Sequence, residues 1–175
     1  MTTNLKTNEI VEAAISLIVA KIGTTITFAP VVVQEGDLSF YVEDIALGDL
    51  PAVYVKAERI GIHIGGDDQD LSDITGDLVG TRTQLRVVMV GQWAAGTNVV
   101  DLRTQYAEEL AQVFILSAGD LFNMNATISG FDILRALPVG IETDPPERIA
   151  ASLNEDRQVY AVAVTVVVEG RSARA

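Results

Sequence analysis

Cysteine is absent from this sequence, and aromatic residues and cations are scarce. Without cysteine the chain forms no disulfide bonds and no thiolate metal sites. Only 12 lysine and arginine residues stand against 24 aspartate and glutamate residues, so the formal net charge is −12. Such a charge repels nucleic-acid phosphates and suits partners with basic patches. No apolar run reaches the roughly 18 residues of a membrane span, and no secretory signal is expected at the N-terminus.

Aliphatic residues are plentiful instead. Hydrophobic residues make up 49% of the 175 positions, although only 6% are aromatic. This supply is sufficient for one hydrophobic core without covalent cross-links. We therefore expect a single domain over residues 1–175, with residues 1–7 and 170–175 as flexible or partner-bound ends.

The strongest strand pattern lies near the C-terminus, in the sequence RQVYAVAVTVVVE of Arg157–Glu169. Large apolar side chains, from Tyr160 to Val168, occupy one set of alternate positions, and small side chains occupy the other. A strand with two apolar faces is expected inside a sheet that is covered on both sides. Either this chain supplies both covers, or a second copy of the chain supplies one.

Two helices are predicted. The first runs over residues 8–22 with Thr7 as its cap, and the second over 98–117, opened by Asn98. The second has the clearest amphipathic pattern, and its Leu110 and Phe114 are expected to pack against the sheet.

Strands and loops account for the remaining segments. Extended segments are predicted at 24–34, 38–46, 52–58, 81–91, 126–142 and 157–169. Segment 61–80 is predicted to be a long loop or a loose hairpin tip, and segment 117–126 a loop. The expected fold class is α+β: a mixed, mostly antiparallel sheet with two α-helices packed on one face.

Helix 8–22 has more apolar residues than a single buried stripe requires. Ile10 and Leu17 fall outside the stripe that contains Ile18. This excess indicates burial on more than one side, so Ile10, Leu17 and Ile18 are candidate contacts with another subunit or a partner.

Arg82 and Arg86 lie four residues apart on one face of the predicted strand 81–91. They indicate either a half-solvated face or a rim that pairs with carboxylates of a neighbouring subunit. The pattern does not decide between these two interpretations.

An acidic segment lies between two predicted strands. Its aspartates are Asp67, Asp68, Asp70, Asp73 and Asp77. Their spacing partly resembles a calcium-binding loop, but the glycine and the distal glutamate that such a loop requires are out of place. We therefore expect no metal site, and treat the five residues as candidates for a lumen-lining or partner-contact loop.

No set of residues in the sequence indicates catalysis. His63 is the single histidine, and no nucleophile motif accompanies it. The glycines of Gly61–Gly66 do not match a dinucleotide fingerprint. No catalytic, cofactor-binding or metal-binding residue is assigned, and an enzyme is not expected.

Three extended segments flank the predicted helices in a recognisable order: DLPAVYV at 49–55, TQLRVVMVG at 83–91 and YAVAVTVVVE at 160–169. This order resembles the tail terminator (tail completion) proteins of long-tailed bacteriophages, and more loosely the neck proteins beside them. The resemblance covers residues 8–169 as an order of elements, and it carries over no catalytic motif.

The resemblance implies a structural virion protein of the tail–neck junction, assembled in the host cytoplasm. Its expected form is a ring, usually of six copies, that caps the tail tube, ends tube polymerisation and joins the tail to the head connector. The implied partners are further copies of the chain, the tail tube protein, the head-side connector or stopper, and the sheath as a further candidate. DNA would pass through the lumen without specific binding, and no membrane is involved.

Three alternatives remain open. The chain could be another neck component such as a stopper, or a tail tube subunit. From a different class, it could be a small acidic ligand-binding or enzyme module.

Overall fold

The computed structural model describes residues 5–36, 47–64, 78–93, 97–145 and 159–173. Within these ranges the helices are α1 (Thr7–Lys21), the short 3-10 helix η2 (Leu47–Asp49), α2 (Val99–Val113) and α3 (Ala118–Ala126). The strands are β1 (Val32–Glu35), β2 (Ala52–Ile64), β3 (Leu78–Gln92), β4 (Phe131–Glu142) and β5 (Val159–Ala173). None of the helices in these ranges is long and apolar enough to cross a membrane.

The five strands form one sheet in the order β1-β2-β3-β5-β4. Strand β1 pairs parallel with β2, and the other three pairings are antiparallel. The predicted α+β class, with a mixed and mostly antiparallel sheet, is confirmed. Strand β5 lies between β3 and β4, as its two apolar faces require.

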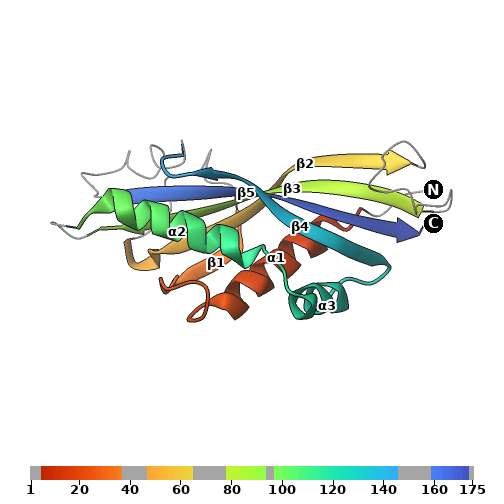
Figure 1. Cartoon of the computed structure of the whole chain (residues 1–175), viewed down its shortest axis with the longest axis horizontal. Coiled ribbons are helices and arrows are strands. Elements are labelled where there is room, and N and C mark those ends of the chain that lie inside the picture. The colour runs from red at the N-terminus through yellow and green to blue at the C-terminus, as the bar shows by residue number, and fades with distance from the viewer. Residues whose placement is uncertain (1–4, 37–46, 65–77, 94–96, 146–158, 174–175) are drawn as a thin grey trace.

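The helices cover one face of this sheet (Figure 1). The large row of β5, including Val162, Val164 and Val166, is fully buried beneath them. Leu110 and Phe114 are also fully buried in this core, as predicted. On the opposite face a smaller cluster contains Ala52, Tyr54, Val88, Val90, Val159, Ala161 and Ala163. No α-helix of the described residues packs on this opposite face, which we call the helix-free face, and it is apolar at one end of the sheet.

The structure corrects the predicted helices. Helix α2 ends at Val113, and the predicted loop 117–126 contains a third helix, α3. Ser117 opens α3 with a capping box, in which its hydroxyl accepts a hydrogen bond from the Asp120 amide and the Asp120 carboxylate accepts one from the Ser117 amide. Helix α1 begins at Thr7 itself, and its N-cap residue is Lys6, so the prediction of Thr7 as the cap was wrong.

Strands β2, β3 and β5 extend further than predicted, whereas β1 and β4 are shorter than the predicted segments 24–34 and 126–142. Strands β2 and β3 pair antiparallel as far as Ile64 and Val79, so both ends of segment 61–80 belong to strands, which agrees with the hairpin alternative for this segment and not with a long loop. Strand β5 continues through Gly170 to Ala173, so residues 170–173 are not a loose end. The ring of Phe131 lies so close over Gly170 that a Cβ there would overlap with it, which explains a glycine inside the strand. Within the predicted segment 24–34 only the last residues form strand, and segment 38–46 lies outside the described residues.

Candidate functional site: the free edges of the sheet

The predicted interface on α1 is buried inside the chain. Ile10 and Ile18 are fully buried, and Leu17 is only 6% exposed. Helix α1 contacts β1, β2, α2 and α3 within the same chain, which is why it needs more apolar residues than one stripe. These three residues are therefore core positions, and the expectation that they contact another subunit is corrected.

Arg82 is paired inside the chain. Its guanidinium lies 2.6 Å from the carboxylate of Glu169, directly opposite on β5. Arg135, on β4, donates a hydrogen bond to the other oxygen of the same carboxylate. One buried carboxylate thus joins three neighbouring strands across the helix-free face.

This arrangement sets the ionisation of Glu169. Burial alone would raise the pKa of its carboxyl group, but the hydrogen bonds and positive charges of Arg135 and Arg82 outweigh burial and lower the pKa below its ordinary value. The carboxylate therefore stays ionised and connects the three strands at neutral pH.

Arg86 forms a second ionic cluster on the same face. It donates two hydrogen bonds to Glu142 of β4, at 2.8 and 3.2 Å, and its Nε lies 3.9 Å from Glu58 of β2. Arg86 is itself buried. Both Arg82 and Arg86 thus have carboxylate partners within this chain, and the Arg82 side chain is 43% exposed, as on a half-solvated face; contact of these arginines with a neighbour's carboxylates stays a prediction.

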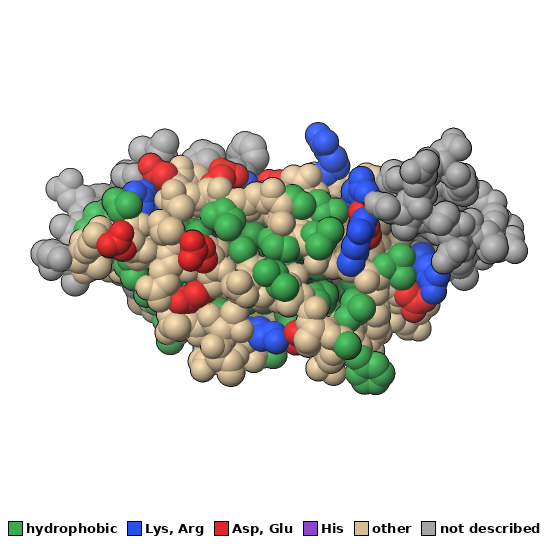
Figure 2. Space-filling model, in the orientation of Figure 1, with side chains coloured by type: hydrophobic (Ala, Val, Ile, Leu, Met, Phe, Trp, Pro, Cys, Tyr) green, Lys and Arg blue, Asp and Glu red, His purple; other side chains and the backbone are tan. Residues whose placement is uncertain are grey.

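Strand β4 exposes apolar side chains at one edge of the sheet. Among the described residues it pairs with β5 only. Asn125 of α3 hydrogen bonds to both the amide and the carbonyl of Ile133, so α3 covers the beginning of the strand. Beyond that point the exposed side chains are Leu134 (37%), Leu137 (43%), Val139 (59%) and Ile141 (48%). We call residues 134–142 the β4 edge; Figure 2 shows hydrophobic side chains gathered over the path of this strand.

On the opposite side of the sheet, the part of the chain that the structure describes leaves a second strand edge without a neighbouring strand. Strand β1 pairs with β2 only from Ala52 to Val55, while β2 continues to Ile64. Among the described residues no strand lies on the outer side of residues 56–64, which we call the β2 edge. Ile60 and Ile62 are 40% and 50% exposed there. At this end the strands also extend past the helices (Figure 1).

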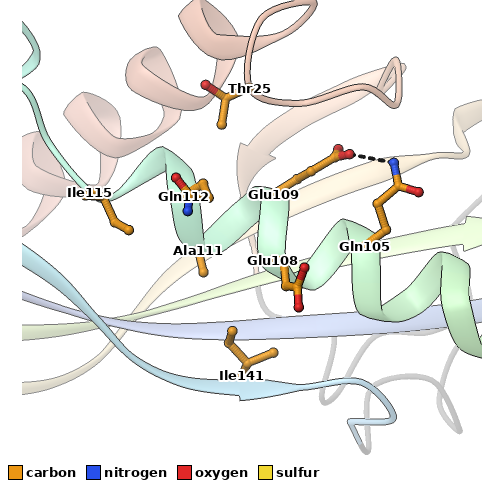
Figure 3. Close-up of a pocket in the computed structure, with 8 residues that line it drawn as sticks. All are labelled: Thr25, Gln105, Glu108, Glu109, Ala111, Gln112, Ile115 and Ile141. Carbon is orange, nitrogen blue, oxygen red and sulfur yellow. Dashed lines mark hydrogen bonds between the residues drawn. The ribbon is translucent and has the colours of Figure 1, made fainter.

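A shallow groove of about 350 Å³ runs along α2 (Figure 3). It is lined by Thr25, Gln105, Glu108, Glu109, Ala111, Gln112, Ile115 and Ile141. The apolar part comes from α2, the residues after it and β4, while Glu108 and Glu109 supply carboxylates. Glu109 accepts hydrogen bonds from the amide and hydroxyl of Thr27, both at 2.8 Å, and so ties α2 to the segment before β1. The open groove thus combines carboxylates with apolar side chains.

Two groups of predicted positions remain outside this description. The five aspartates Asp67, Asp68, Asp70, Asp73 and Asp77 lie in residues 65–77, outside the described residues. His63 lies in β2, and its side chain is outside the described part of the structure.

Sequence reasoning missed Glu169 and the two free edges. Glu169 could have been found, because it is the single acidic residue in an apolar strand and two arginines lie on another strand. The edges could not, because sequence patterns do not give the order of strands in a sheet. Comparison with known proteins provides no further assignment, since no protein-family model and no curated protein matches the sequence.

Proposed function

We propose that this chain is a structural subunit that closes into a ring, in the manner of a tail terminator of a long-tailed bacteriophage. The observation that carries this proposal is a pair of strand edges, the β4 edge and the β2 edge, which lie on opposite sides of one sheet and have no further strand beside them among the described residues. Unpaired strand edges with exposed apolar side chains favour association with another chain. Two different contact surfaces on opposite sides give head-to-tail contacts, which close into a ring when the rotation per subunit divides a full turn.

The acidic character of the chain fits a ring that DNA traverses. At a net charge of −12, few cations are available to displace the counterions of DNA. On the helix-free face, carboxylates neutralise Arg82, Arg86 and Arg135. DNA would therefore pass such a ring without being held by it.

The groove along α2 is the surface that we assign to contact with a tail component. Its carboxylates would attract basic side chains, and Ala111, Ile115 and Ile141 would accept apolar ones. The tail tube protein and the head-side connector are the partners that this role requires, because a terminator ends one assembly and joins it to the next.

The test is a mass measurement of the purified chain, alone and mixed with tail tubes. A terminator should form a discrete ring of defined mass, most simply a hexamer, in solution or on the tube end. A tube subunit would instead polymerise by itself without limit. A chain that stays monomeric in both conditions while binding a small ligand would overturn the proposal in favour of a binding or enzyme module.

A further inference from the structure

We infer that the β4 edge of one copy pairs antiparallel with the β2 edge of the next copy, so that the sheets of neighbouring subunits are continuous. This inference rests on the proposed ring and specifies its subunit contact. It assigns the partner of both edges as a second copy of this chain.

Strand direction supports this pairing. Strand β2 is antiparallel to β3, β3 to β5, and β5 to β4. Three reversals make β4 antiparallel to β2 within one sheet. If a second copy in the same orientation is placed beside β4, its β2 therefore runs antiparallel to β4. Two antiparallel strands can form backbone hydrogen bonds with each other directly.

The two edges also lie at the same height in the sheet. The register runs from Ala136 to Val168, from Val168 to Thr83, and from Thr83 to Ile60. Residues 135–140 of the β4 edge are thus level with residues 61–56 of the β2 edge, whereas Ile141 and Glu142 are level with Val55 and Tyr54, where β1 pairs. When a continuous sheet closes on itself, its strands tilt and neighbouring strands shift along one another. A modest shift of this kind is the only offset needed between the two edges of neighbouring copies.

The lengths and side chains of the two edges correspond. The β2 edge begins where β1 stops pairing, and the β4 edge begins where Asn125 stops covering the strand. Each edge carries exposed aliphatic side chains, which the pairing would remove from water. Pro138 and two irregularities in the pairing with β5 interrupt β4. Such features restrict the registers that a neighbour can adopt and so oppose unlimited aggregation.

The absence of cysteine makes this pairing directly testable. Double variants would combine Ile60→Cys or Ile62→Cys with Leu134→Cys, Leu137→Cys or Val139→Cys. A disulfide forms only when two Cα atoms lie about 4.4–6.8 Å apart, so a cross-link identifies neighbouring positions. We expect at least one combination to give a ladder of covalent oligomers that ends at the ring.

Matched controls separate specific pairing from collision. Each single-cysteine variant should give no ladder, because the contact joins two different edges. The double variant Val19→Cys/Val100→Cys, at positions that are 51% and 62% exposed on α1 and α2, should also give none. In parallel, Ile62→Lys should abolish rings while Val100→Lys leaves them intact, because lysine on a sheet edge opposes pairing.

Ring formation is scored separately, by imaging the same samples with tail tubes. Rings with edge cross-links would support the inference. Rings that form without any edge cross-link, and that tolerate Ile62→Lys, would overturn the edge pairing and leave the proposed ring intact. Failure to form any oligomer, in solution or on tubes, would overturn both.

Discussion

Helix α1 and strand β4 are both rich in aliphatic residues, yet they occupy opposite situations in the molecule. In α1, Ile10 and Ile18 are fully buried by other parts of the same chain. In β4, Val139 and Ile141 remain about half exposed at the edge of the sheet. The difference arises from position, because α1 lies against four other elements and β4 has one neighbouring strand among the described residues.

This comparison shows that an excess of apolar residues does not by itself mark an interface. A helix enclosed on several sides uses the excess for its own core. An edge strand has unpaired backbone groups as well as exposed side chains, and both favour a further strand. Side chains buried within the chain should therefore control its stability, and the two strand edges should control its assembly.

The largest effect on stability is expected at Phe114. It is fully buried between the end of α2 and the sheet, so Phe114→Ala should lower the free energy of unfolding by about 3–5 kcal/mol. Denaturant unfolding of the purified chain measures this loss. An unchanged unfolding midpoint would show that the end of α2 is not part of the core.

A matched pair of aliphatic truncations tests the comparison itself. Ile18→Ala should cost about 2–5 kcal/mol because it leaves a cavity, whereas Val139→Ala, at an exposed position, should stay within about 0.5 kcal/mol. Thermal unfolding of the two variants, at a concentration where the chain is monomeric, gives both values. Equal losses would contradict the separation between core helix and free edge.

Glu169→Gln should lower the free energy of unfolding by about 1–3 kcal/mol at pH 7, because it removes the charge that joins Arg82 and Arg135. The pKa of Glu169 is lower in the folded chain than its ordinary value of 4.5. Its stabilising contribution is therefore complete above that pH and is lost as the pH falls through the folded pKa. The difference in the free energy of unfolding between the wild type and the variant should therefore decrease on acidification. A difference that increases would contradict the lowered pKa of Glu169.

Apart from the exposed position Val139, the smallest effect is expected at the start of α3. Ser117→Ala removes the hydroxyl that caps this helix and should cost about 1 kcal/mol. The hydrogen bond from Lys21, at 2.8 Å, together with the hydrogen bonds of the same capping box, lowers the pKa of Asp120 to about 2. Hydrogen exchange of α3 amides should speed up in the variant, while the amides of β5 should be unaffected.

Elements with a strong pattern could be predicted from the sequence, and those defined by their neighbours could not. The alternation in β5 and the stripe of α2 are properties of single segments, so their type and burial were correct. Helix α3 is short and depends on its capping box and its packing, and it was interpreted as a loop. The extension of β2 to Ile64 depends on pairing with β3; the alternation of Ile62, His63 and Ile64 is strand-like, but it lies in a segment that was interpreted as a long loop or a loose hairpin tip. The candidate site was the least predictable part, because it depends on strand order.

The most direct test of the account is imaging of tail tubes with the protein bound. The account predicts a single ring at the tube end, with β4 of each subunit next to β2 of its neighbour. Density scattered along the tube wall, or subunits that contact one another through α1, would contradict it.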